Sequence, residues 1–152
     1  MSDNHDDDLI RQFEDCSLPL DRFRHSVHIQ IVFLYLCRCP VLDVLGRFPE
    51  ALKRYAAAHG KTRLYHETIT WAYILLIQER MARAGQGQTW GEFRLSNPDL
   101  LNWNDSILKQ YYSENTLWSE TARKIFLFPD RAPAFPCQAK PVVQPQEHSV
   151  SG

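Results

Sequence analysis

The sequence predicts an all-α protein in which three long helices pack up-down-up and several short C-terminal helices complete the bundle. In the first half of the chain, apolar residues recur at spacings of three and four over long stretches, which is typical of amphipathic helices. We find no alternating apolar and polar segment bounded by turn residues, the pattern typical of strands. The 152 residues fit one domain, which would bury about two-thirds of the surface of its unfolded chain.

The first long helix is expected from about Arg22 to Arg38. Its apolar residues cover most of the helix circumference, which favours a central position in the bundle. Asp21 is expected to cap its start. Pro40 is expected either to end this helix or to begin the next one.

The second long helix is expected from about Pro40 to His59, with Gly60 just beyond its end. Pro49 interrupts this pattern, because proline has no backbone N–H and tends to kink or split a helix. The third long helix is expected from about Tyr65 to Ala84. Because the connections between the three helices are short, neighbours are expected to run antiparallel, which gives the up-down-up order.

Several short helices are expected after the third long one. Thr89 and Glu92 form a capping-box pattern, and Asn104-Asp105 is expected to cap a helix over Ser106–Tyr112. Ser113 and Ser119 are expected to start two more. Asn102-Trp103-Asn104-Asp105 is interpreted either as a cap and turn or as a lid over a pocket.

The expected domain boundaries follow from changes in composition. Residues 1–17 are acidic and weakly patterned, and they are expected to form a flexible N-terminus. Residues 18–128 are expected to form a single helical domain. Residues 129–152 are rich in proline and lack periodicity, so a disordered Pro-rich tail is expected there.

Charge and cysteine content narrow the expected partners and location. A formal net charge of −1 gives no reason to expect nucleic acid or an anionic membrane surface as a partner. The apolar run from Ile29 to Cys37 is too short to span a bilayer. The four cysteines show no disulfide framework, which favours a reducing, cytoplasmic location.

A histidine cluster is the main functional prediction. In an up-down-up bundle, the start of the first helix and the start of the third lie at the same end. His25 and His28 are three residues apart, so they share one helix face, and His66 begins the third helix. Neutral imidazoles of these three residues would suit a divalent transition metal such as zinc, iron, manganese or copper. Whether His59 joins the cluster is left open.

Three functions are compatible with such a cluster. The first is a small metal-dependent enzyme acting on a small polar molecule, with Glu67 as base or ligand and Tyr65 orienting the substrate. The second is a non-enzymatic module that binds a small ligand or another protein, in which the histidines form a structural hydrogen-bond network. The third is a metal-free enzyme that uses His66 and Glu67 as acid and base. The reaction, the substrate and the oligomeric state are left open.

Three motifs, Phe23-x-His25-x-x-His28, Ala57-Ala58-His59-Gly60 and Tyr65-His66-Glu67-Thr68-Ile69-Thr70, resemble an uncharacterised family of small all-helical bacterial proteins. The resemblance covers roughly Leu18 to Arg131. It implies helices and a recurring set of His, Tyr and Glu residues, and it implies no activity. The chain departs from the family pattern at Val27 and Gln30, where acidic and basic residues are expected, and at Pro49.

Overall fold

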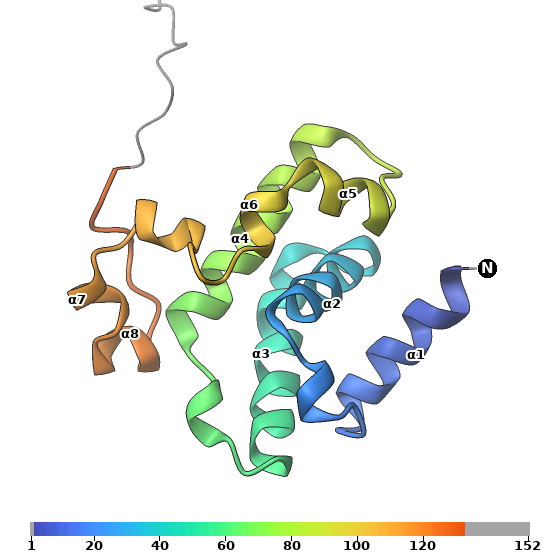
Figure 1. The fold of residues 1–152 in the computed structure, drawn as a ribbon, viewed down its shortest axis with the longest axis horizontal. Helices are drawn as coiled ribbons and strands as arrows, with labels where there is room; N and C mark the ends of the chain where they lie inside the picture. Colours follow the sequence, from blue (N-terminus) through green and yellow to red (C-terminus); the bar gives the residue numbers. More distant parts are fainter. Residues whose placement is uncertain (1, 133–152) are drawn as a thin grey trace, which may run out of the picture.

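The computed structural model describes residues 2–132, and within that range every regular element is a helix. Three long helices dominate, namely α2 (His25–Arg38), α3 (Val41–Ala58) and α4 (Glu67–Ala84). Each of them packs against the other two (Figure 1). The all-α class is therefore confirmed, whereas the up-down-up order stays a prediction.

Helix α2 lies at the centre of the molecule, as its apolar circumference predicts. It contacts α3 and α4, and also α1, α5 and α6 from other parts of the chain. Its buried residues are Ile29, Ile31, Val32, Phe33, Leu34 and Tyr35. A helix surrounded in this way holds its first turn firmly in place, and that turn carries His25 and His28.

Helix α3 is continuous from Val41 to Ala58, although Pro49 lies inside it and is buried. Pro49 therefore does not split the helix, but it leaves the carbonyl of Leu45 without its usual intrahelical donor. Gly60 follows the C-cap residue His59, and its φ of 67° is one that residues with a Cβ rarely adopt. The N–H of Gly60 donates to the carbonyl of Ala57 (3.1 Å) and that of Lys61 donates to the carbonyl of Ala56 (2.7 Å), which together form a Schellman cap.

The N-terminal segment forms helix α1 (Ser2–Glu14), drawn in dark blue in Figure 1. The prediction of a flexible N-terminus over residues 1–17 is therefore wrong for residues 2–14. Phe13 is fully buried, and its ring lies 5.6 Å from that of Phe23 and 5.5 Å from that of Phe48 between centroids. Aromatic rings from distant parts of the chain pack around Phe13 and hold α1 in place, although α1 contains few apolar residues.

The remaining elements are short. They are α5 (Trp90–Ser96), α6 (Pro98–Leu101), α7 (Glu114–Leu117), α8 (Glu120–Lys124) and the 3-10 helices η1 (Leu20–Arg22), η2 (Thr62–Leu64) and η3 (Ile107–Gln110). The capping box of Thr89 and Glu92 is confirmed, and so are the helix starts at Ser113 and Ser119. Two predicted caps are wrong. Ser106, which follows Asn104-Asp105, caps η3, and Asp21 lies within η1 and does not cap α2.

The ordered domain extends past residue 128. The carboxylate of Asp130 accepts hydrogen bonds from the backbone N–H of Ser113 (2.8 Å) and from the hydroxyls of Ser113 (2.6 Å) and Thr116 (2.8 Å), all at the start of α7. The N–H of Arg131 donates to the carbonyl of Tyr111 at 2.9 Å. These contacts move the predicted boundary at 128 to Arg131 at least. The rest of the predicted tail, from residue 133, lies outside the described residues.

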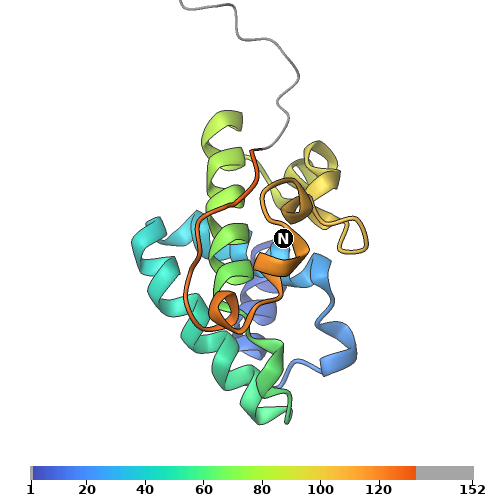
Figure 2. The ribbon, with the colours of Figure 1, turned by 90° about the vertical axis from the view of Figure 1, so that its left-hand side faces the viewer.

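Helix α8 packs against α4, and α7 packs against α8; Figure 2 shows this segment in orange on the side that faces the viewer. The hydroxyl of Thr68 in α4 donates to the carbonyl of Ile125 (2.8 Å) and accepts from the N–H of Leu127 (3.1 Å). The C-terminal segment is thus fastened to the first turns of α4. Among residues 2–132 no helix is long and apolar enough to cross a membrane.

Candidate functional site

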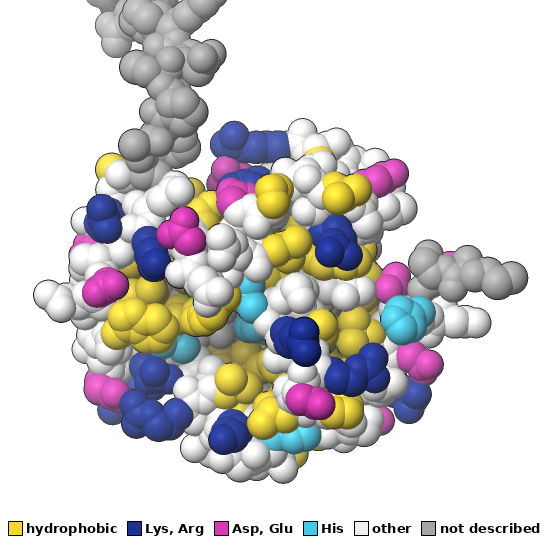
Figure 3. Space-filling model, in the orientation of Figure 1, with side chains coloured by type: hydrophobic (Ala, Val, Ile, Leu, Met, Phe, Trp, Pro, Cys, Tyr) yellow, Lys and Arg dark blue, Asp and Glu magenta, His cyan; other side chains and the backbone are white. Residues whose placement is uncertain are grey.

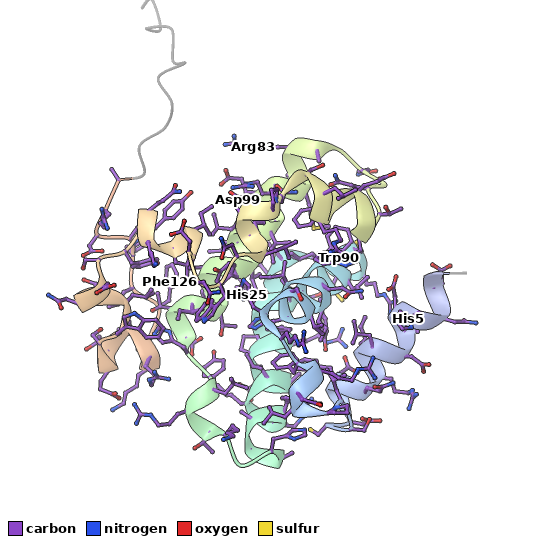
Figure 4. All side chains as sticks on the ribbon, viewed as in Figure 1. His5, His25, Arg83, Trp90, Asp99 and Phe126 are labelled. Carbon is purple, nitrogen blue, oxygen red and sulfur yellow. The ribbon has the colours of Figure 1, made fainter. Side chains whose placement is uncertain are left out.

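A cavity of about 280 Å³ lies where the start of α2, the start of α4 and the C-terminal loops meet. Its lining includes three histidines and three arginines, namely His25, His28, His66, Arg24, Arg63 and Arg123, together with the hydroxyl-bearing Thr70 and Tyr73. Aromatic and apolar side chains complete the walls. Figure 3 shows a hollow on this face in which histidines lie beside hydrophobic side chains, and Figure 4 places His25 near the centre of the molecule.

His66 is the N-cap residue of α4. Its ring Nδ1 accepts a hydrogen bond from the N–H of Ile69 at 3.1 Å. Its Nε2 lies 2.7 Å from the carbonyl of Leu117, to which it donates. Because Nδ1 accepts and Nε2 donates, both nitrogens are used by the neutral imidazole. Burial lowers the pKa of His66 below its usual 6.5, which also favours the neutral form.

His25 connects the start of α2 to α6. Its Nε2 lies 2.9 Å from the carbonyl of Leu100, an acceptor, so this nitrogen carries the proton. Its ring packs edge-on against Tyr73, with 5.0 Å between centroids, and lies 5.2 Å from the ring of Trp103. Burial lowers the pKa of His25 as well. His25 is therefore a neutral imidazole held in place from two directions.

His28 differs from the other two because its Nε2 is buried and has no hydrogen-bond partner in the described part of the chain. Its ring packs between aromatic neighbours, 5.7 Å from the ring of Phe23 and 5.2 Å from that of Phe48. Burial, and to a smaller extent the nearby His25, lower the pKa of His28 to about 3. A neutral, desolvated nitrogen without a partner costs free energy. Other atoms of His28 line the cavity, whereas Nε2 itself is shielded from it.

The three histidines line one cavity, but their geometry does not suit a metal. Across residues 2–132, no group of three or more His, Cys, Asp or Glu side chains is placed to hold an ion. His66 has no free lone pair, since both of its ring nitrogens are engaged in hydrogen bonds. The predicted metal site at His25, His28 and His66 is therefore corrected to a set of neutral imidazoles.

The predicted catalytic pair does not line the cavity. The hydroxyl of Tyr65 is buried with no partner among the described residues, and Lys53 Nζ lies 4.9 Å from the centre of its ring. Burial, followed by the charge of Glu67, raises the pKa of Tyr65 above its usual value. Glu67 lies in the first turn of α4 and is partly buried.

His59 also lies apart from the cavity lining. Its Nε2 is 3.1 Å from the carbonyl of Cys16, and its ring lies 4.3 Å from that of Tyr55. His59 therefore fastens the end of α3 to the turn that follows α1, and it does not join the other histidines.

Two tryptophans that border the cavity were not predicted as a pair. Trp103 and Trp118 are 43% and 53% exposed, and their rings are perpendicular with 6.5 Å between centroids. Each indole also lies against an imidazole of the cavity, Trp103 against His25 and Trp118 against His66 at 5.9 Å. The segment around Trp103 both turns, through a 3.1 Å bond from the N–H of Asp105 to Asn102 Oδ1, and borders the pocket. The turn in that segment is therefore confirmed, and the lid stays a prediction.

The arginines give the cavity a positive edge. No Asp or Glu of residues 2–132 lines it. Arg123 donates to the carbonyls of Arg63 (2.8 Å) and Tyr65 (3.2 Å), which hold it in place and leave its charge unneutralised. Arg63 pairs with Glu120 at 3.2 Å, but both side chains are mostly exposed, so water screens that pair.

Comparison with known proteins gives no family model that matches the chain. No curated protein and no solved structure matches it either. The fold and the site define an all-helical domain with an aromatic, positively edged pocket.

Proposed function

We propose that the chain is a ligand-binding helical domain that takes up one small organic molecule in the cavity, without a metal ion. The observation that carries this proposal is the pair of exposed, perpendicular indoles of Trp103 and Trp118, which line the same cavity as the three neutral imidazoles. Large exposed aromatic side chains beside a concave site are typical of ligand-binding surfaces. The up-down-up order of α2, α3 and α4 belongs to this proposal, because it would bring the starts of α2 and α4 to the same end.

The arrangement supports binding better than acid–base catalysis. Backbone groups engage both ring nitrogens of His66 and the Nε2 of His25, which leaves few nitrogens free for proton transfer. Burial lowers the pKa of both, and that of His28 to about 3, which disfavours the protonated form that a general acid must donate from. Glu67, the base of the enzymatic hypothesis, does not line the cavity.

The test is a fragment titration monitored by tryptophan fluorescence. The set contains neutral, anionic and cationic compounds with one or two rings. We expect a saturable change with at least one fragment, lost in both Trp103→Phe and Trp118→Phe. Trp90→Phe is the matched control, because Trp90 packs on Phe33 and Phe93 and does not line the cavity. The proposal fails if no fragment gives a saturable change at millimolar concentration, or if the signal survives in both pocket variants.

A further inference from the structure

We propose that His66 is an acid-sensitive latch that holds Trp118 in the wall of the cavity, and that protonation of its ring releases this wall while the rest of the fold stays packed. The inference goes beyond the proposed function, because the movement takes place whether or not a ligand is bound. It is carried by two hydrogen bonds, one at each nitrogen of a buried imidazole.

The hydrogen bond from Ile69 requires the neutral form of His66. The N–H of Ile69 donates to Nδ1 at 3.1 Å, so Nδ1 must keep its lone pair. A proton on Nδ1 would set two N–H donors against each other, and the cap of α4 would be lost. The second bond, from Nε2 to the carbonyl of Leu117 (2.7 Å), persists only while the ring keeps its position.

The surroundings of His66 oppose a positive charge on the ring. The residue is only 5% exposed, and burial is the main cause that lowers its pKa. Arg123 also lowers this pKa, and its guanidinium is held in place by the carbonyls of Arg63 and Tyr65. The first turn of α4 adds the positive end of the helix dipole. The hydrogen bond to Leu117 acts the other way but does not outweigh burial. A protonated ring is therefore more stable in water than in this position.

No carboxylate of the described residues lines the cavity to offset that charge. Helix α3 contributes only the apolar Leu52 to the lining, and α7 meets the ring through a backbone carbonyl. Glu67 follows His66 in the chain and Glu120 pairs with Arg63, but neither carboxylate lines the cavity. The charged and titratable side chains that share the lining with His66 are those of Arg24, His25, His28, Arg63, Tyr73 and Arg123. A proton on His66 therefore adds to an excess of positive charge.

The direction of the pH effect follows from the two pKa values of the ring. In the latched form the pKa of His66 lies below 6.5, whereas a released ring in water titrates near its ordinary value of about 6.5. The latched form is therefore fully favoured above about pH 6.5 and is progressively lost below it. The ratio of latched to released molecules falls by up to about tenfold per pH unit.

Release is confined to the end of α7. Trp118 follows Leu117 directly and is 53% exposed, and its indole lies perpendicular to the imidazole of His66 at 5.9 Å. The chain after α8 is fastened separately to α4, through two hydrogen bonds of the Thr68 hydroxyl that involve no titratable group. Loss of the His66 contacts therefore frees Trp118 and leaves the long helices packed.

The test is amide hydrogen exchange of the full, isotope-labelled chain, measured by NMR at pH 7.5 and pH 5 and corrected for the intrinsic exchange rate at each pH. Two amides report release: that of Ile69, which donates to the ring, and that of Trp118, which donates to the carbonyl of Glu114. We expect the protection of both to fall about threefold or more at pH 5. Because the opening is local, about 1 M urea is expected to leave both values unchanged.

Two variants assign the effect to His66. His66→Asn keeps a capping oxygen but cannot take up a proton, so the fall in protection is expected to disappear. His28→Phe is the matched control, because it removes another imidazole of the same cavity and leaves both hydrogen bonds of the latch. This control is expected to keep the full fall at Ile69 and Trp118. Circular dichroism at both pH values establishes that each variant is folded.

Three outcomes would overturn the latch. Equal protection of Ile69 and Trp118 at pH 7.5 and pH 5 would show that protonation releases nothing. A fall that persists in His66→Asn would belong to another group, and a fall that urea enlarges would report global unfolding. The fluorescence titration with fragments tests the proposed function separately, since the exchange measurement needs no ligand.

Discussion

The imidazole of His66 joins the first turn of α4 to the end of α7 through a 2.7 Å hydrogen bond from its Nε2 to the carbonyl of Leu117. The same ring caps α4, because Nδ1 accepts from the N–H of Ile69. One side chain therefore starts a long helix and also fixes the segment that ends in Trp118. The wall of the cavity depends on this double role.

Replacing His66 separates the two roles. His66→Ala removes the helix cap, which costs about 1 kcal/mol of stability. It also leaves the carbonyl of Leu117 without its hydrogen-bond donor, which costs about 1–3 kcal/mol more. We expect a total loss of about 2–4 kcal/mol in the free energy of unfolding, measured by urea denaturation. His66→Asn keeps a capping oxygen and is expected to lose less. Equal losses in the two variants would show that the cap contributes nothing.

Zinc is expected to leave the protein unchanged. A ligand that binds the native state raises Tm by mass action, and His66 has no free nitrogen to offer a metal. A tenfold molar excess of zinc is therefore expected to shift Tm by less than about 1 °C, and elemental analysis of the purified protein is expected to show less than one metal per chain. A rise in Tm that disappears in His25→Ala would restore the metal site.

Stability is expected to fall between pH 6.5 and pH 5. The pKa values of His25, His28 and His66 are all lowered in the folded protein by burial, so the unfolded chain binds protons first as the pH falls. Their stabilising contribution is complete above the unfolded value of about 6.5 and is lost below it. For His28, whose folded pKa is about 3, the slope is about 1.4 kcal/mol per pH unit.

The pH window separates these histidines from the acidic residues. The pKa values of Asp99 and Asp130 are lowered, mainly by hydrogen bonds from Arg80 and Ser113 respectively, so their contribution is lost only below about pH 4. Urea denaturation at several values between pH 7.5 and pH 5 therefore reports on the imidazoles. His28→Phe is expected to flatten the slope, and His5→Gln, an exposed control, is expected to leave it unchanged. An unchanged slope in His28→Phe would contradict the assignment of this pH dependence to His28.

Replacing Gly46, inside α3, and Gly60, just after it, by alanine is expected to change the stability of the protein in opposite directions. Gly46 lies in the exposed helix interior, and a Cβ there meets no atom within 4 Å, so Gly46→Ala is expected to stabilise the protein by about 0.5–1 kcal/mol. A Cβ at Gly60 also has space, but the φ of 67° disfavours it. Gly60→Ala is therefore expected to cost about 1–2 kcal/mol. Thermal unfolding of both variants checks the pair, and the same sign for both would contradict it.

The long helices were predictable because their signals are local. Periodic apolar residues define α2, α3 and α4 in the sequence, and Thr89, Ser113 and Ser119 cap the short helices as their side chains predict. Pro49 shows the limit of a local rule. A missing N–H weakens a helix, but burial of the proline ring in a packed interface holds α3 together.

The pocket could be predicted only in part. The spacing of His25 and His28 and the placement of His66 at a helix start pointed to a shared cavity, whereas their partners, the carbonyls of Leu100 and Leu117, come from distant loops. Because these backbone acceptors carry no sequence signal, the same imidazoles were interpreted as metal ligands. Trp103 and Trp118 belong to irregular segments, and the three arginines come from separate parts of the chain, so only tertiary packing decides which of these side chains meet.

The docking of α1 has a practical consequence for anyone who shortens this chain. The ring of Phe13 also lies 5.6 Å from that of Tyr55, so one side chain of α1 covers Tyr55, Phe23 and Phe48 at once. A version of the protein that begins at Leu18 would uncover all three rings together and lose the ion pair of Arg38 with Asp7. Such a fragment is expected to self-associate through this exposed apolar face. Affinity tags are therefore best placed ahead of Ser2, and the acidic N-terminal segment is best retained.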